Sequence, residues 1–340
     1  MTDRLLAETV ERLLSDVCTA EEVERAEHAG WSEATWKALA DAGFPWVGLD
    51  ESGGGSGGTL YDLAAILRAV GRFAAAVPIA ETALLGGWCL AQAGLPLPAG
   101  PITVIERPAV VVDGRVRVDD VVAWARQAER IVAIAPGVDA PQAFSLQSDQ
   151  ISVTPGANLA GESRDRVVVD VRVVDVEHGV LGRGTSGLHE RGALSRVMMA
   201  AGALSAMAQL TVDYTSERRQ FGQPVARFQA VQQHLVTVTQ SAVQVQMAAD
   251  VALAALDRGD VGPTVAAARV VMDDAITLAT RAAHQAHGAM GVTREYPLHQ
   301  LTRRLWAWRH EWGTSTEWRR RLGRYAATAG ADALFTLITD

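Results

Sequence analysis

The residues best suited to chemistry lie in one run, Tyr214 to Gln232, between two long helical patterns. Arg218 offers a planar guanidinium that suits a diphosphate or a carboxylate. Phe221, which follows Gln220, can lie against a flat ring, and Gln229 can both donate and accept hydrogen bonds. This combination favours a nucleotide cofactor held between helices. The alternative is an ordinary helix hairpin, which needs only polar residues and one glycine or proline.

A second run, Gln285 to Glu295, places glycines at the end of another helical pattern. Gly288 lets a backbone come close to a ligand because no Cβ intervenes. The alternative is that Gly288 only terminates the helix. His287 precedes it, but no second ligand lies at helical or CxxC-like spacing, so we expect no metal site.

A third run, Arg303 to Ser315, contains one carboxylate, Glu311. Gly313 is a helix terminator, and Thr314 with Glu317 forms a capping box for the next helix. A purely structural interpretation of this run is therefore available.

The elements that must position these runs are mostly helical. Apolar residues recur at helical spacing from Leu5 to Val17, and Thr19, Ser32 and Thr59 are predicted N-caps. The glycine-rich loop before Thr59 is not followed by Gly-Lys-Ser/Thr, so we expect a flexible turn and not a phosphate-binding loop.

From about Pro101 the hydrophobic period changes to two. Asp113-Gly114 between valine runs predicts a hairpin with a type I′ turn. Further strands are expected at 131–134, 151–153 and 167–174.

Five long helical patterns follow this β region, and their lengths suit an antiparallel bundle. We therefore expect an N-terminal helical domain (1–100), a small β domain (101–185) and a C-terminal helical bundle (186–340). The five patterns cover residues 189–218, 227–257, 263–288, 297–313 and 314–330.

Composition limits the function classes. The 340-residue chain has 49% hydrophobic residues and a net charge of −8, with a pI near 5.5. This charge argues against nucleic acid as a partner, which calls for a basic face. Cys18 and Cys89 are interpreted as reduced core thiols. With no signal-peptide pattern and no apolar run that approaches a membrane span, we expect a soluble cytoplasmic protein without a membrane partner.

The first run closely resembles the R-x-x-F-G-x-P-(I/V)-x-x-F-Q signature of the acyl-CoA dehydrogenase superfamily. The expected order of helices, β domain and helical bundle is also the order of that family. The resemblance implies a mainly α fold with a β insert, FAD as cofactor, and an acyl-CoA thioester as substrate. It implies these cofactor-binding residues: Arg218, Gln220, Phe221, Gln229, Gln285, His287, Gly288, Ala289 and Thr314.

The chain departs from the family pattern at its reactive groups. Ala289 replaces the second glycine of the family's glycine run. In many members the glutamate before Gly-Thr-Ser removes the substrate α-proton, but here that position is Trp312 and Glu311 falls one residue early. One helical step turns a side chain by about 100°, so Glu311 is a fallback base. Arg196 matches a family arginine beside the CoA cleft.

The family motifs that hold the flavin ring do not occur between residues 101 and 183. The resemblance therefore implies a subunit that contributes half of each flavin site, as in short actinobacterial members that form heterotetramers with a longer homologous partner. The implied reaction is α,β-dehydrogenation in fatty acid or sterol degradation, with an electron-transfer flavoprotein as acceptor. Two alternatives stay open: a non-catalytic scaffold subunit, or a flavin oxidase or monooxygenase on the same fold.

Overall fold

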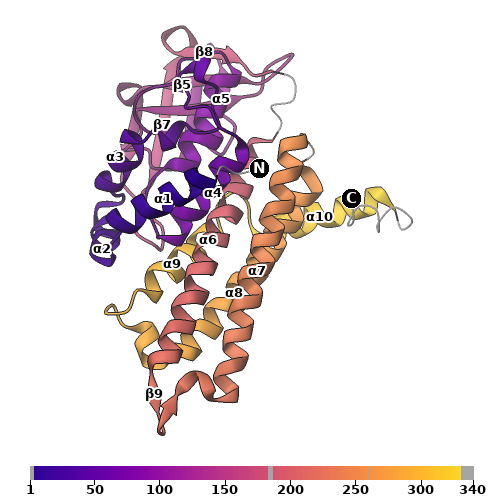
Figure 1. Cartoon of the computed structure of the whole chain (residues 1–340). Helices are drawn as coiled ribbons and strands as arrows, with labels where there is room; N and C mark the ends of the chain where they lie inside the picture. Colours follow the sequence, from indigo (N-terminus) through magenta and orange to yellow (C-terminus); the bar gives the residue numbers. More distant parts are fainter. Residues whose placement is uncertain (1–3, 183–186, 260, 331–340) are drawn as a thin grey trace. The chain divides into compact units, whose positions relative to one another are not determined.

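The structure is a computed structural model that describes residues 4–182, 187–259 and 261–330 (Figure 1). The chain divides into two compact units. The first comprises Met1–Val70 with Ala75–Gly192, and the second comprises Gly71–Ala74 with Ala193–Asp340. The N-terminal helices and the β strands thus share one unit. The predicted boundary between residues 185 and 186 lies outside the described residues.

Three helices of the first unit, α2, α3 and α4, begin at the predicted caps. The hydroxyls of Thr19, Ser32 and Thr59 accept hydrogen bonds from the backbone N–H groups three residues later, at 3.3, 3.1 and 3.2 Å. These bonds satisfy amides that the helix itself leaves without acceptors. The bounds are α1 (Arg4–Val17), α2 (Ala20–Ala29), α3 (Glu33–Asp41), α4 (Leu60–Arg72) and α5 (Gly87–Gln92), with a π-helix at Ala80–Gly86 before α5.

The glycine-rich loop before α4 is a tight turn. Leu49 and Gly57 form an isolated antiparallel bridge. At Gly55 a Cβ would lie 2.2 Å from the carbonyl oxygen of Leu49, so this position requires glycine. The glycines therefore have a structural role in closing the turn.

Two four-stranded sheets follow, with strand orders β1-β4-β5-β8 and β2-β3-β7-β6. Among the described strands, only β1 and β4 pair in parallel. Residues of both sheets, including Ile131, Phe144, Val167 and Val169, form one buried apolar cluster, so the sheets share a core. The bounds are β1 (Ile102–Val104), β2 (Val110–Val112), β3 (Arg115–Ala123), β4 (Arg130–Ala135), β5 (Gln142–Leu146), β6 (Ile151–Thr154), β7 (Arg164–Arg172) and β8 (Glu177–Val180).

The predicted β2–β3 hairpin is confirmed, since Asp113 (φ 52°) and Gly114 (φ 69°) both adopt the positive φ of a type I′ turn. The predicted strand 167–174 is displaced, because β7 runs from Arg164 to Arg172. Strands β1, β5 and β8 were not predicted, since segments of three to five residues show too little alternation.

The second unit consists of long helices joined by short turns. Its elements are most of α6 (Leu188–Glu217), α7 (Gln229–Arg258), α8 (Gly262–His287), α9 (Leu298–Trp308) and α10 (Ser315–Ala329). The fourth helix of the bundle is shorter than the predicted range 297–313. It ends at Trp308, and the following residues form a turn instead of a continued helix.

Helix α6 corrects the expectation that no apolar run approaches a membrane span. Among the described helices it is long and apolar enough to do so, with a mean hydropathy of 1.2 over its best window. However, 72% of that window is buried inside the protein. An apolar helical segment that is mostly buried is typical of a core helix.

Candidate flavin site

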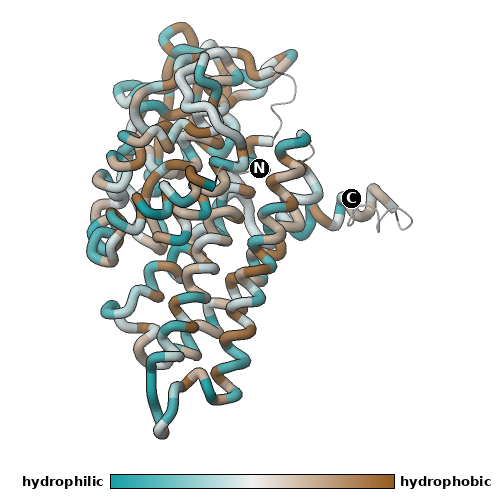
Figure 2. The backbone as a smooth tube through the Cα atoms, in the orientation of Figure 1, coloured by the Kyte–Doolittle hydropathy of each residue, from teal (hydrophilic) through white to brown (hydrophobic). Residues whose placement is uncertain are grey.

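The loop between α6 and α7 is a small hairpin whose tip carries Phe221. Strands β9 (Arg219–Gln220) and β10 (Gln223–Pro224) pair antiparallel. Phe221 (φ 50°) and Gly222 (φ 80°) form the turn. A positive φ is strained for a bulky residue and is a mark of functional sites. Phe221 is 92% exposed, and its ring meets that of Phe228 edge to face, with ring centroids 6.0 Å apart. Most of the hairpin around it is hydrophilic (Figure 2).

Helix α8 ends at His287, and Gly288 turns the chain away. Gly288 has φ 59° and ψ −137°, a region in which a side chain is disfavoured. A Cβ at this position would have no atom within 4 Å among the described residues. The glycine thus presents bare backbone to open space.

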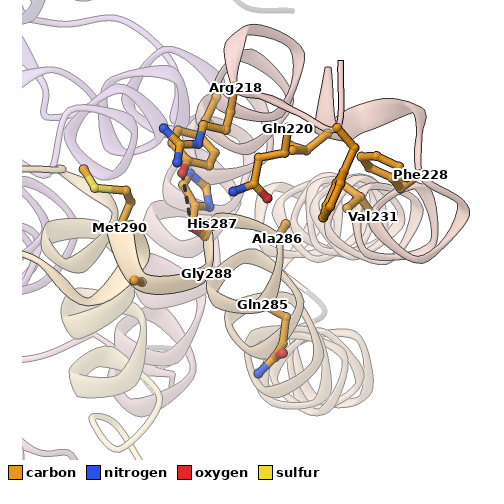
Figure 3. Close-up of a pocket in the computed structure, with 13 residues that line it drawn as sticks. Arg218, Gln220, Phe228, Val231, Gln285, Ala286, His287, Gly288 and Met290 are labelled. Carbon is orange, nitrogen blue, oxygen red and sulfur yellow. Dashed lines mark hydrogen bonds between the residues drawn. The ribbon is translucent and has the colours of Figure 1, made fainter. Parts of the chain in front are cut away.

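Between these two segments lies a pocket of about 500 Å³, a volume typical of small-molecule sites. Figure 3 shows the amide of Gln220 directed toward the side occupied by Arg218 and His287, with Phe228 and Val231 opposite. The lining residues are Tyr214, Arg218, Gln220, Phe221, Val225, Phe228, Val231, Gln285, Ala286, His287, Gly288, Ala289 and Met290.

Tyr214 and His287, which both line this pocket, stack on each other and lie against Tyr296. The rings of Tyr214 and His287 are parallel within 20°, with centroids 4.5 Å apart, and Tyr296 lies 5.0 Å from His287. The hydroxyl of Tyr214 donates to the backbone carbonyl of His287 at 3.2 Å. The stack therefore fixes the orientation of the imidazole.

One nitrogen of the His287 imidazole has no hydrogen-bond partner among the described residues. Nδ1 of this ring lies 2.8 Å from the carbonyl oxygen of Ala283, so Nδ1 carries the proton. Nε2 is buried and has no hydrogen-bond partner among the described residues. Burial lowers the pKa of His287, although the Ala283 contact opposes this shift. A neutral imidazole with an unpaired Nε2 is a hydrogen-bond acceptor, and its residue lines the pocket although Nε2 itself is buried.

Arg218 supplies the positive charge of the site. Its backbone closes α6 and the hairpin, through N–H to Tyr214 O (2.8 Å) and C=O to the Val225 N–H (2.8 Å). No hydrogen bond or ion pair of its guanidinium occurs within the described part of the chain. The backbone of Arg218 is thus fixed by hydrogen bonds, while its guanidinium is available to bind an anion.

Two predicted cofactor residues lie outside this pocket. Gln229 is the exposed first residue of α7. Thr314 is the N-cap of α10, where its hydroxyl donates to Glu317 Oε2 (2.8 Å) and accepts from the Glu317 N–H (3.3 Å). The remaining predicted cofactor residues all line the pocket.

The two residues expected near the substrate form an ion pair with each other. Arg196 Nε lies 2.7 Å from Glu311 Oε2, and the arginine is only 2% exposed. Arg196 also approaches Ser195 Oγ at 3.3 Å through Nη1. One oxygen of the fallback base is thus engaged by a buried cation.

A buried arginine of α8 holds the turn that carries Glu311. Arg269 Nη2 donates to the carbonyl oxygens of Arg309, Glu311 and Gly313, at 3.0, 3.2 and 3.0 Å. Within this turn Trp312 adopts φ 57° while 5% exposed. The backbone bonds to Arg269 fix this conformation.

Several of these residues were not identified from the sequence. Tyr214 precedes Arg218 by one helical turn, so its position on the same face was the available signal. Tyr296 and Arg269 gave no such signal, because their partners are distant in the chain. Among the described residues no group of acidic, histidine or cysteine side chains could hold a metal ion.

Known proteins resemble this chain throughout these regions. Family models for the acyl-CoA dehydrogenase N-terminal and C-terminal domains match residues 2–96 and 184–326. Acyl-CoA dehydrogenase FadE28 of Mycobacterium tuberculosis is 27% identical over 299 residues, covering 79% of this chain and 85% of FadE28.

Solved structures show the same fold. A chain of the ChsE4-ChsE5 complex from Mycobacterium tuberculosis gives a TM-score of 0.84 at 24% identity, covering 97% of this chain and 99% of that chain. A chain of the Tcur3481-Tcur3483 steroid ACAD gives 0.85 at 23% identity, covering 95% and 97%. The expected fold is confirmed, and the chain belongs to the acyl-CoA dehydrogenase family of flavoenzymes.

Proposed function

We propose that this protein carries out FAD-dependent α,β-dehydrogenation of an acyl-CoA thioester as the shorter subunit of a complex that shares flavin sites with a longer homologous partner. The observation that supports this most strongly is the pocket of the C-terminal unit. It joins two distant sequence runs, and its lining residues include a guanidinium and a buried imidazole nitrogen without partners among the described residues. We place the protein in the cytoplasm, with an electron-transfer flavoprotein as electron acceptor.

The residues of the pocket fit the adenosine diphosphate portion of FAD. A diphosphate needs a cation, and Arg218 offers an uncommitted guanidinium fork. The buried Nε2 of His287 needs a hydrogen-bond donor, which the hydroxyl and amino groups of an adenosine can supply. Gly288 leaves space where a side chain would intrude.

Each group of the pocket has a distinct role in this proposal. Arg218 neutralises the diphosphate, while Phe221 and Phe228 offer aromatic faces to the adenine. Gln220 adds an amide that can donate and accept. FAD bound here would supply the hydride acceptor for the β-carbon of the substrate, while the chain's own residues would bind and orient the cofactor.

The proton acceptor is proposed to come from the partner subunit. Arg196 occupies one oxygen of Glu311, which opposes the use of this carboxylate as a base. A base must lie within hydrogen-bond reach of the α-proton, and the pair holds Glu311 toward Arg196 instead. Glu311 remains the fallback base. Arg196 is proposed to act beside the CoA cleft by anchoring the 309–313 turn through its ion pair with Glu311.

The acyl group is proposed to be bulky, as in sterol or fatty acid side-chain degradation. Support comes from the replacement of the usual base position by Trp312 and from the heteromeric and steroid-related names of the two structural neighbours. These neighbours share the fold at low identity, so their substrates are a guide and not an assignment.

The test is to purify the chain alone and together with the product of its neighbouring gene, then measure mass and flavin absorbance per subunit. We expect flavin only in the complex, at one per heterodimer. A homotetramer of the lone chain with one flavin per subunit would contradict the shared site.

The second candidate is a non-catalytic scaffold subunit, favoured by the engaged Glu311 carboxylate. It predicts a stable complex in which Arg218→Ala leaves flavin content unchanged. The third candidate, an oxidase or monooxygenase, predicts that substrate-reduced flavin reoxidises rapidly in air.

A further inference from the structure

The first unit contains an arginine that stacks on a tryptophan and has no counterion. The guanidinium carbon of Arg191 lies 4.0 Å from the centroid of the Trp88 ring, and both side chains are partly buried. No hydrogen bond or ion pair of the Arg191 guanidinium occurs among the described residues. Stacking engages the face of this planar group and leaves the N–H donors at its edge for an anion.

The backbone holds both members of this pair in place. Trp88 is the second residue of α5 and follows the π-helix, a conformation that often occurs at functional sites. The residue before it, Gly87, is packed so tightly that a Cβ there would lie 2.2 Å from the carbonyl oxygen of Thr82. At the start of α6, the Arg191 N–H donates to the carbonyl oxygen of Gly187 at 2.7 Å. The stacked arrangement therefore rests on ordered helical backbone on both sides.

This environment is unfavourable for a cation alone. Burial lowers the pKa of Arg191 to about 10, although the interaction with Cys89 opposes the shift. The group is still protonated at neutral pH. Cys89 cannot serve as its counterion there, because burial raises the pKa of this thiol to about 12. Arg191 is also the fourth residue of α6, near the helix end whose dipole disfavours positive charge. An anion bound to the guanidinium would offset these costs.

The chemistry of the pair favours a carboxylate over a phosphate. Arg191 is a single cation, and Cys89 is the one described titratable group whose interaction shifts its pKa. A carboxylate carries one negative charge and can accept two parallel hydrogen bonds from the guanidinium edge. A phosphate monoester carries about −1.5 to −2 at neutral pH, so a single arginine would leave part of its charge without a partner. The indole of Trp88 adds apolar surface for the carbon chain of an organic acid.

We propose that Arg191 and Trp88 form a binding site for the carboxylate of a small organic acid. Both residues belong to the first unit, and neither lines the candidate flavin pocket. The site is therefore separate from the groups assigned to the flavin diphosphate, and the proposal does not depend on the proposed function. The rival explanation is that the pair only packs the start of α6 against α5.

The experiment measures binding of phenylbutyrate to the purified full chain by isothermal titration calorimetry at neutral pH and constant ionic strength. Phenylbutanamide, which has the same apolar part without the charge, and inorganic phosphate are the comparison probes. The test variants are Arg191→Gln and Trp88→Leu. The matched control is Arg12→Gln, because Arg12 is an exposed arginine of the same unit without a hydrogen bond or ion pair in the described part of the chain.

We expect one phenylbutyrate site per chain, with much weaker binding of the amide and of phosphate. Arg191→Gln should weaken phenylbutyrate binding by roughly tenfold or more, the effect of losing a charge-assisted hydrogen bond. Trp88→Leu should cause a smaller loss, and Arg12→Gln should bind like the wild-type chain. The proposal is overturned if the wild-type chain shows no saturable binding, if Arg191→Gln binds equally well, or if phosphate binds more tightly than phenylbutyrate.

A second measurement does not require Arg191→Gln to fold. Phenylglyoxal, which modifies arginine side chains, is added to the wild-type chain with and without phenylbutyrate, and the modified residues are located by mass spectrometry. Phenylbutyrate should slow the modification of Arg191 and leave that of Arg12 unchanged. Equal modification of Arg191 in both conditions, or equal protection of Arg191 and Arg12, would contradict a site at this pair.

Discussion

The candidate flavin pocket and the 309–313 turn belong to the same unit, yet their polar groups differ in whether they have partners within the protein. In the pocket, Arg218 and the Nε2 of His287 lack partners among the described residues. In the turn, Arg269 donates to three carbonyl oxygens and Glu311 pairs with Arg196. Groups with internal partners stabilise the fold, whereas groups without partners are available to a ligand. Five variants test this distinction.

The largest effect is expected for Arg269→Ala. The change removes the hydrogen bonds to the turn and leaves the buried Asp273, whose pKa burial already raises, without the attraction of Arg269. Breaking such a buried network costs about 3–5 kcal/mol of unfolding free energy, measured by urea denaturation. The control is Arg319→Ala, which removes an exposed ion pair and should cost less than about 1 kcal/mol. Similar losses of unfolding free energy in Arg269→Ala and Arg319→Ala would contradict this expectation.

Arg218→Ala should weaken flavin binding with little change in stability. Losing a charge-assisted hydrogen bond costs about 1.5–3 kcal/mol, roughly tenfold to a hundredfold in the flavin dissociation constant. The neighbouring Arg219 is exposed and does not line the pocket, so Arg219→Ala is the matched control. Fluorescence titration of the purified complex measures both. Equal losses would indicate a general charge effect.

Glu311→Gln should change turnover by less than about tenfold if the partner supplies the base. A general base contributes about 10²–10⁴-fold, so a loss in that range, with normal flavin content, would identify Glu311 as the base. The measurement is the rate of flavin reduction by acyl-CoA in the complex.

Phe221→Asn should stabilise the protein while weakening flavin binding. The change creates Asn-Gly, the preferred pair for a type I′ turn, and relieves a positive φ at a bulky residue. We expect a gain of about 0.5–1 kcal/mol by thermal or urea unfolding. A loss of stability would show that the Phe221–Phe228 contact outweighs the backbone strain.

His287→Phe should flatten the dependence of stability on pH. Because burial lowers the pKa of His287 in the folded protein, the unfolded state binds more protons as the pH falls below about 6.5. Stability therefore decreases from about pH 6.5 down to the lowered pKa. The variant should lose part of this slope, whereas His310→Gln, at an exposed position, should retain it. An unchanged dependence of stability on pH in His287→Phe would contradict the assignment of this dependence to His287.

Much of the fold could be predicted from the sequence because its signals are local. Glycine and threonine caps at Gly259, Thr59 and Thr314 marked helix ends, and Asp113-Gly114 marked a hairpin. The failures have physical causes. The end of α9 at Trp308 depends on Arg269, which lies about 40 residues away in the chain, and short strands carry too little periodicity.

The candidate site was only partly predictable for the same reason. Glycine and arginine spacing identified both walls of the pocket, but the stack of Tyr214, His287 and Tyr296 depends on contacts between separate segments. The sequence likewise gave no indication that Arg196 and Glu311 would pair, since 115 residues separate them.

The β9–β10 hairpin has an evolutionary consequence. It is held by two residue pairs, and its tip residue is 92% exposed, so folding places few demands on its sequence. Substitutions of Phe221 and its neighbours are therefore selected mainly for their effect on ligand and partner binding, and little for their effect on folding. In a lineage that changed its subunit composition, this hairpin is where new specificity could arise without loss of the native structure.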